Sequence, residues 1–139
     1  MKQQLLTLVR AFALFLVAGS AFGQTINVRA NVPFDFVVSG KTLPAGDYAI
    51  STNPAGSALF VQSLQSGKIT IAGAGYNAEN LNLAQQSKLV FTKYGNTYFL
   101  HQVWEDGKAD ARELPKSHRE AALSADYPLS SEVIVPSVR

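Results

Sequence analysis

The side chains best suited to acid–base chemistry lie in one predicted strand and in the turn that follows it. His101 stands among apolar residues, while Glu105 and Asp106 immediately precede Gly107. Two carboxylates can hydrolyse a glycosidic bond when they flank a cleft about 5 to 10 Å apart, and a histidine can transfer protons near neutral pH. Acidic residues before a glycine are also typical of turns, and a histidine among apolar side chains is commonly structural. We therefore interpret Glu105 and Asp106 as turn acids, and a hydrolase that uses His101 or Glu105/Asp106 as an alternative.

Most other catalytic and metal-binding chemistries lack the residues they need. The chain has no cysteine, which excludes thiol catalysis, thiolate metal sites and lipid attachment through a cysteine. Its two histidines, His101 and His118, share no metal-ligand spacing, and no serine has the Gly-x-Ser-x-Gly environment of an esterase. Gly40-Lys41-Thr42 ends like a phosphate-binding loop, but Asp35 occupies the position of the first glycine. We expect no catalytic residue, no metal and no cofactor.

The N-terminal 23 residues have the pattern of a secretory signal peptide. Lys2 and Arg10 flank the start of an apolar run over residues 11–18, and small residues then precede a cleavage site between Gly23 and Gln24. The run is well below the roughly 20 residues that span a bilayer, so we expect it to be removed and to leave no stable membrane anchor. The sequence predicts an exported protein, either periplasmic or extracellular.

Removal of residues 1–23 changes the charge balance of the chain. Lys2 and Arg10 are two of its 12 basic residues, so ten basic residues remain against ten acidic ones. The net charge of +2 thus belongs to the precursor, and the electrostatic case for nucleic acid or an anionic membrane disappears. Residues 24–139 have the length of one ordinary domain, and we predict a single domain there.

This domain is predicted to be all-β. Short runs rich in β-branched and aromatic residues alternate with Gly, Pro, Asn and Ser, which indicates a small β-barrel or β-sandwich of about seven or eight strands. Pro33 separates the first two runs, and we interpret them as one bent edge strand. Residues 125–139 form either a last strand or a loose tail. The predicted strands are Ile26–Asn31, Phe34–Val38, Asp47–Thr52, Ala58–Leu64, Lys68–Ala72, Lys88–Tyr94, Thr97–Trp104 and Glu132–Val135.

The clearest local signal is a hairpin at Gly95-Asn96, where a glycine in the first loop position favours a type II′ turn. A regular register from this turn pairs Tyr94 with Thr97, Thr92 with Phe99, Val90 with His101 and Lys88 with Val103. One face then carries Leu89, Phe91, Tyr98, Leu100 and Trp104, and the other carries Val90, Tyr94, Phe99 and Val103. Because both faces are apolar, we expect a closed barrel, a central position in a sandwich, or a covering partner chain.

Two further segments depart from strand patterning. Residues 73–86 are rich in glycine, asparagine and glutamine, and we predict a mobile polar loop there. Ser117 and Glu120 are spaced as a capping box, which predicts one short helix near the C-terminus. The preceding segment, Arg112–Ser117, either latches this helix onto the domain through Leu114 and Leu123 or is a recognition epitope.

Several runs resemble a family of short exported bacterial proteins, found mainly in soil bacteria. The resemblance covers most of residues 24–139 and implies export and a β-rich single domain. It implies no activity, cofactor or binding residue. The runs are Val32–Phe36, Leu43–Tyr48, Leu89–Phe91, Tyr94-Gly95, Tyr98–Leu100, Trp104 and Arg112–Ser117.

The leading hypothesis is an exported, non-catalytic β-domain with a binding or structural role at the cell envelope or outside the cell. Apolar strands are abundant, and the two-sided hairpin suggests self-association or an envelope partner. The main alternative is a small carrier that holds an apolar ligand inside a barrel, although an eight-stranded barrel is often filled by its own side chains. The candidate ligand-binding residues are Tyr94, Tyr98, Phe99, His101 and Trp104.

Overall fold

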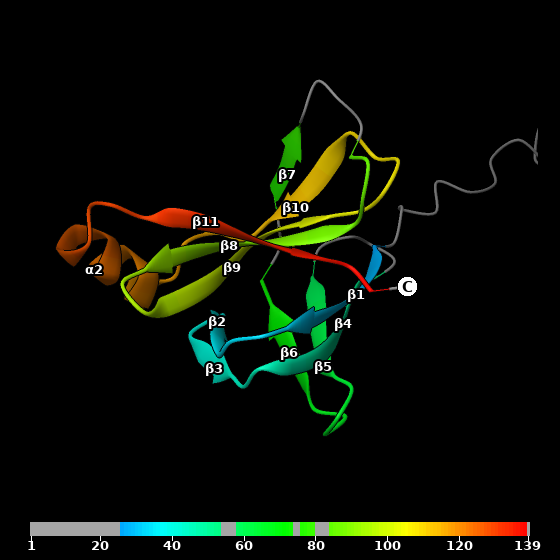
Figure 1. Cartoon of the computed structure of the whole chain (residues 1–139), viewed down its shortest axis with the longest axis horizontal. Helices are drawn as coiled ribbons and strands as arrows, with labels where there is room; N and C mark the ends of the chain where they lie inside the picture. The colour runs from blue at the N-terminus through cyan, green and yellow to red at the C-terminus, as the bar shows by residue number, and fades with distance from the viewer. Residues whose placement is uncertain (1–25, 54–57, 74–75, 80–83, 139) are drawn as a thin grey trace, which may run out of the picture.

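The computed structural model of the chain describes residues 26–53, 58–73, 76–79 and 84–138, the third range as backbone only. The predicted signal peptide and its cleavage site at Gly23-Gln24 lie outside these ranges. The described residues form two β-sheets and one helix, α2 (His118–Asp126), which confirms the all-β prediction (Figure 1). Sheet A has the order β1 (Asn27–Val32), β4 (Gly46–Thr52), β5 (Leu59–Ser63), β6 (Ile69–Ala72). Sheet B has the order β11 (Ser131–Pro136), β8 (Lys88–Tyr94), β9 (Thr97–Trp104), β10 (Asp110–Glu113), β7 (Tyr76–Glu79), with β2 (Phe36–Val38) beside β9 and β3 (Lys41–Leu43) beside β2.

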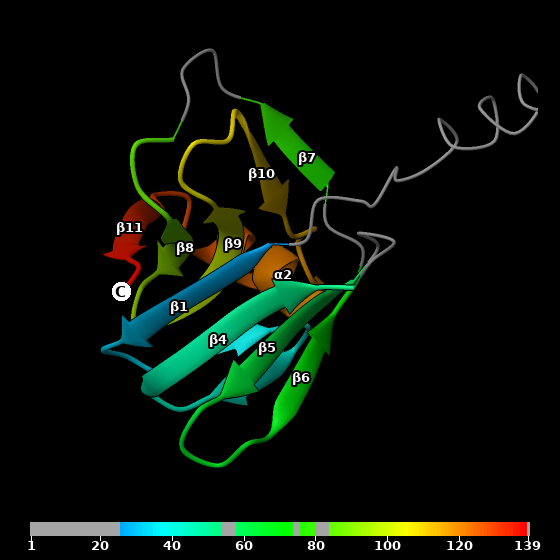
Figure 2. The same cartoon turned by 90° about the vertical axis from the view of Figure 1, so that its right-hand side faces the viewer.

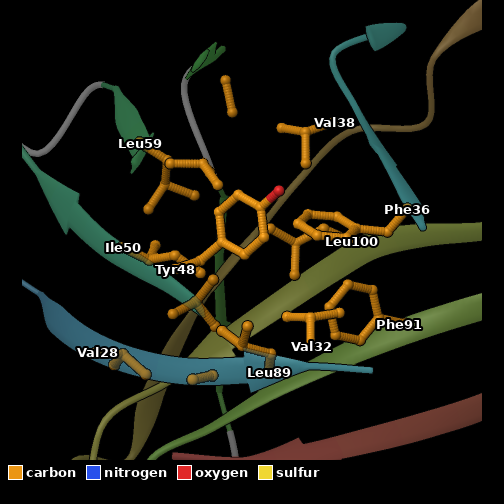
Figure 3. Packing of buried hydrophobic residues seen from close by; sticks show 14 of the residues in the cluster. Val28, Val32, Phe36, Val38, Tyr48, Ile50, Leu59, Leu89, Phe91 and Leu100 are labelled. Atoms are coloured by element: carbon orange, nitrogen blue, oxygen red, sulfur yellow. The ribbon is translucent and has the colours of Figure 1, made fainter. Parts of the chain in front are cut away.

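The main core lies between the two sheets. Buried and more exposed residues alternate along β1 and β4, so each of these strands turns one apolar face inward. Tyr48 lies at the centre of this layer, 2 % exposed, with its ring edge against Phe36 and its hydroxyl donating to the Pro44 carbonyl oxygen at 2.5 Å (Figure 3). The side chains labelled with it in Figure 3 are Val28, Val32, Phe36, Val38, Ile50, Leu59, Leu89, Phe91 and Leu100.

Among the described residues the sheets form a sandwich and do not close into a barrel, so the barrel alternative is wrong. The two sheets meet along one side, where the Val138 amide donates to the Arg29 carbonyl at 2.9 Å. On the other side, the only described neighbour of β6 is β5 and that of β7 is β10, so each sheet has a free edge there among the described strands (Figure 2). The space between the sheets is filled by side chains from both inner faces, as in other sandwiches.

The chain changes sheets at Pro33, which corrects the prediction of one bent edge strand. β1 pairs with β4 in sheet A, whereas β2 pairs with β3 and, in parallel, with β9 in sheet B. Proline cannot donate to a ladder, and residues 33–35 cross from one layer to the other. Phe34 fastens this crossing, because its ring stacks on Tyr98 at 3.8 Å and meets the Phe91 ring edge-on at 5.0 Å.

The β8–β9 hairpin begins as predicted and then departs from the predicted register. Gly95 has a φ of 60°, as a type II′ turn requires, and Tyr94 faces Thr97. A β-bulge then places Phe91 opposite Leu100 but Val90 opposite Gln102, so His101 is the extra residue.

The bulge moves the end of β9 to the opposite face from the one predicted. Past an extra residue, every side chain of a strand changes sides. Val103 therefore joins Leu89 in the core between the sheets, and Trp104 packs with Val90 on the outer face of sheet B.

Three short strands were not predicted, namely β3, β7 and β10. β7 lies within the predicted polar loop over residues 73–86, so that prediction is wrong for its four residues; residues 74–75 and 80–83 lie outside the described ranges. These strands lack apolar alternation and exist because each pairs with a neighbour. The C-terminal segment forms β11, which decides between the predicted last strand and loose tail.

The predicted helix is confirmed, and it covers the outer face of sheet B. The Ser117 hydroxyl caps α2 by accepting from the Glu120 amide at 3.2 Å. Leu123 packs against Tyr94, Phe99 and Val37. Farther along the same face, Ala84 packs against Val90, Trp104 and Ala111. The chain thus covers both apolar faces of its hairpin by itself.

Candidate functional site

The five predicted ligand-binding residues do not meet in one cavity. Tyr94 and Phe99 pack against each other beneath α2, with ring centres 5.8 Å apart. Tyr98 belongs to the opposite face, where Phe34 stacks on it, and Trp104 lies in a separate cluster on the outer face. Four of the five residues are therefore parts of three separate packing clusters, His101 belongs to none of them, and none of the clusters is a shared ligand chamber.

His101 lies in the β-bulge beside Glu113 of β10. Its Nε2 is 4.0 Å from Glu113 Oε1, and both side chains are partly exposed. Gln102 donates to Glu113 Oε2 at 3.1 Å and accepts from Trp104 Nε1 at 3.0 Å. A histidine beside a carboxylate needs a nucleophile to perform hydrolysis, and within the described ranges no hydroxyl is hydrogen-bonded to His101. This geometry orients the Trp104 indole and forms a surface ion pair when His101 is protonated.

Glu120 is the buried ionisable group on this side of sheet B. Its side chain is 5 % exposed, and Tyr94 donates its hydroxyl to Oε1 at 3.3 Å. Burial raises the pKa of Glu120, and the hydrogen bond from Tyr94 and the charges of His101 and Lys116 offset only part of that rise. The carboxyl borders a hollow of about 40 Å³. Since one water occupies roughly 30 Å³ in the liquid, such a hollow suits a water molecule and not an organic ligand.

The acidic turn does not present a pair of free carboxylates. Glu105 Oε2 lies 2.5 Å from Lys108 Nζ, so this carboxylate is already paired. The backbone amide of Asp106 donates to the Ser87 hydroxyl at 2.9 Å, and Gly107 takes a positive φ of 78°. These contacts are those of a tight turn. No group of three or more acidic or histidine side chains within the described ranges could hold a metal ion.

Two larger hollows lined by described residues are also below the size of ordinary ligand pockets. One of about 90 Å³ opens between β3 and the β5–β6 hairpin, where Tyr48 and Val61 line its apolar part. Another of about 230 Å³ borders β10 at Lys108 and Arg112. Pockets for small molecules usually measure about 300 to 1,000 Å³. An exposed surface is therefore a better candidate for a binding site than any of these hollows.

The strongest candidate is the free edge of β6, the last strand of sheet A (Figure 2). The Ile69 and Ile71 side chains are 53 % and 60 % exposed and lie on the outer face of the sheet, while Thr70 between them is buried at 2 %. Phe60 on β5 stands directly opposite Ile71 and is only partly buried. Leu64, 46 % exposed, follows β5 in the hairpin turn. An apolar surface thus lies beside the free edge of β6, and we call this surface and edge together the β6 edge. Its side chains are Phe60, Leu64, Ile69 and Ile71.

The hydrogen-bonding pattern of the β5–β6 hairpin determines which backbone N–H and C=O groups of β6 point toward β5 and which point toward the free edge. Ser63 donates its amide to the Lys68 carbonyl at 2.9 Å, which makes Ser63 and Lys68 a hydrogen-bonded pair. Hydrogen-bonded and non-hydrogen-bonded pairs alternate along an antiparallel ladder, so Thr70 bonds to Val61. The N–H and C=O groups of Ile69 and Ile71 consequently point away from β5, toward the free edge.

The other edge strands among the described residues carry features that oppose strand addition, and β6 does not. β3, which pairs with β2 on one side, begins with the charged residue Lys41. Arg29 of β1 already accepts a hydrogen bond from Val138. β11 carries Glu132 and ends in Pro136, which has no amide hydrogen, and β7 ends in Glu79. Charged residues and prolines are the usual protection of edge strands. The four residues of β6 include neither, which leaves this edge open to a further strand.

The sequence predicts a strand at Lys68–Ala72, where β6 lies, but no site there. The signal was present in Ile69-Thr70-Ile71, an alternation that places either the threonine or the isoleucines inward, and only packing chose the threonine. No protein-family model, curated protein or solved structure matches the chain. Within the described ranges, no helix has the length and apolar character to cross a membrane. The described residues thus form a two-sheet β-sandwich, in which the β6 edge lacks the charged residues and prolines of the other described edges.

Proposed function

We propose that the protein is an exported, non-catalytic β-domain that binds a protein partner by adding a strand of that partner to the β6 edge. The observation that carries this proposal is the coincidence at Ile69 and Ile71 of outward-pointing backbone groups and exposed apolar side chains. In strand addition, main-chain hydrogen bonds supply affinity, and pockets or patches for alternate side chains supply specificity. The β6 edge offers both.

A binding role is also favoured by the way the remaining side chains are used. Glu113 lies beside His101 and accepts from Gln102, and Glu105 is paired with Lys108. The apolar side chains of the hairpin are buried by α2 and by sheet A. At the β6 edge, by contrast, backbone N–H and C=O groups and large apolar side chains have no partner among the described residues.

Strand addition can be tested with a synthetic peptide that copies residues 66–73 of the chain. We expect the peptide to shift and to protect from exchange the amides of Ile69 and Ile71 in ¹⁵N spectra of dilute protein, because these amides would donate to the added strand. The matched control is a peptide with proline in place of both isoleucines, because proline has no N–H group to donate to the carbonyl groups of Ile69 and Ile71. Shifts confined to another edge, or the same shifts with the proline peptide, would refute the proposal.

Export is part of the proposal and has its own test. The segment before Gln24 has the charged start, apolar run and small residues of a signal peptide. We expect protein recovered outside the cytoplasm to begin at Gln24, as N-terminal sequencing or intact mass would show. Intact precursor confined to the cytoplasm would contradict export without bearing on the β6 edge.

A further inference from the structure

We propose that the strand that occupies the β6 edge is β6 of a second copy of this chain, paired antiparallel about a two-fold axis at Thr70. This inference rests on the proposed function and names its partner. It would join the two copies of sheet A into one continuous sheet, with the same surface used on both sides, as a two-fold interface requires.

The backbone of β6 is self-complementary in this register. With the axis at Thr70, Ile69 stands opposite Ile71 of the second copy, and Ile71 opposite Ile69. These are the two residues whose N–H and C=O groups point outward, so each such pair can exchange both backbone hydrogen bonds. A shift of one residue would instead pair outward-pointing groups with inward-pointing ones. A shift of two residues keeps this parity but pairs one of the two isoleucines with a glycine, Gly67 or Gly73. The axis at Thr70 is therefore the register in which both outward-pointing isoleucines pair with isoleucines.

The side chains fit the same register. On the outer face, Phe60 and Ile71 of one copy would continue into Ile69 and Gln62 of the other, which covers the most exposed apolar residues of the sheet. Opposite neighbours of this kind are the stabilising unit of a sheet.

The charged residues near the axis are also compatible with this dimer. Lys68 is the basic residue nearest the axis, and it would lie opposite Ala72 of the second copy. The two Lys68 residues would be four strand positions apart, about 14 Å, which exceeds the Debye length at physiological salt.

The size of the edge predicts a weak dimer. Each copy contributes a four-residue strand and a few neighbouring side chains. A typical stable interface has about 20 to 30 residues on each side, roughly five times as many as the strand supplies. We therefore expect a monomer–dimer equilibrium that depends on concentration, and a variant with lysine at both Ile69 and Ile71 that stays monomeric. In that variant, lysines would face each other across the axis.

The absence of cysteine from the chain makes a register test possible. In the proposed dimer Thr70 faces its own copy in a non-hydrogen-bonded pair, with a Cα separation of about 4.5 Å, within the range of disulfides. Under mild oxidation we expect Thr70→Cys to form a covalent dimer at least tenfold faster than Ile71→Cys. Random collision predicts the reverse order, because residue 71 is 60 % exposed and residue 70 only 2 %.

Light scattering after size-exclusion chromatography completes the test if the buried Thr70→Cys variant does not fold. We expect the unaltered chain to shift toward dimer as concentration rises, and Ile69→Lys/Ile71→Lys to remain a monomer. Ile134→Lys, which alters an equally exposed isoleucine on β11, should leave the equilibrium unchanged. A dimer abolished by Ile134→Lys, or faster oxidation of Ile71→Cys than of Thr70→Cys, would overturn the inference.

The outcomes separate this inference from the proposed function. If the peptide of residues 66–73 protects the Ile69 and Ile71 amides but the chain stays monomeric at every concentration, the edge binds strands and the second copy is not the partner. If the peptide has no effect and the chain is monomeric, both proposals fail.

Discussion

Replacing Glu120 by glutamine tests whether burial governs this carboxyl group in the folded state. Glu120 lies on α2 and is 5 % exposed, and among the described residues its side chain accepts one hydrogen bond, from the Tyr94 hydroxyl. Because burial raises its pKa above the ordinary value of 4.5, the folded protein binds a proton here more tightly than the unfolded chain does. The proton therefore stabilises the fold below pH 4.5, and this contribution is lost as the pH rises through the folded-state pKa.

The magnitude follows from proton linkage. Where the folded state holds this proton and the unfolded chain does not, the free energy of unfolding falls by up to about 1.4 kcal/mol per pH unit. Glutamine carries no titrating proton, and its carbonyl oxygen can still accept from Tyr94. We expect Glu120→Gln to remove this slope, and to be more stable than the parent at pH 7.5 by about 1.4 kcal/mol for each unit by which the pKa is raised.

Urea unfolding at pH 4, 5.5 and 7.5, followed by Trp104 fluorescence, measures this difference. Glu132→Gln on β11 is the control, because Glu132 is exposed and its replacement should leave the pH dependence unchanged. The reasoning would be refuted if Glu120→Gln kept the parental slope, or if it lost stability at pH 7.5 while gaining none relative to the parent at pH 4. A parental slope would show that folding does not raise the pKa of Glu120, whereas a loss of stability confined to pH 7.5 would show that the folded protein favours the charged carboxylate.

Three further substitutions test the packing, the turn and the helix cap, all by urea unfolding. Phe91→Ala removes a fully buried ring that meets two other aromatic rings, and it should cost about 3 to 5 kcal/mol with an unchanged or smaller denaturant slope. Gly95→Ala places a Cβ at a φ of 60° and 3.2 Å from the Tyr127 ring, so it should cost more than about 1 kcal/mol; equal stability would contradict the turn geometry. Ser117→Ala removes the cap of α2 and should cost about 1 kcal/mol, with Ser117→Gly costing less.

Local patterns predicted the elements whose residues prefer one conformation. The apolar runs 88–94 and 97–104 became β8 and β9 with the predicted ends, because β-branched and aromatic residues flank a glycine that favours the turn. Ser117 likewise predicted the start of α2, since its hydroxyl can satisfy an amide that the helix leaves free.

The candidate site was predicted less well than the fold. The aromatic residues of the hairpin were expected to bind a ligand or partner, but α2 and sheet A bury them. The isoleucines of β6 were expected only as part of a strand. Which face of that strand is covered depends on where the rest of the sandwich lies, and a four-residue alternation does not contain that information.

The bulge at His101 shows the same limit within a correctly predicted hairpin. A regular ladder placed Trp104 with Leu89, whereas the extra residue exchanges Trp104 for Val103 in the core between the sheets. Both residues are apolar, so neither register conflicts with the pattern, and the choice is made by the fit of Val103 against sheet A and of Trp104 against Val90 and Ala111.

Short-range interactions, which can be read from the residues alone, account for the runs that favour strands, the glycine turn of the main hairpin and the cap of α2. Composition and residue positions alone show the lack of cysteine and of metal-ligand spacing. The tertiary structure decided the separation of β1 from β2 into different sheets, the strands β3, β7 and β10, and the exposure of Ile69 and Ile71. These features depend on contacts between residues far apart in the chain. Whether a strand lies at the edge of a sheet depends on how all the other strands pair, so no local sequence pattern predicts it.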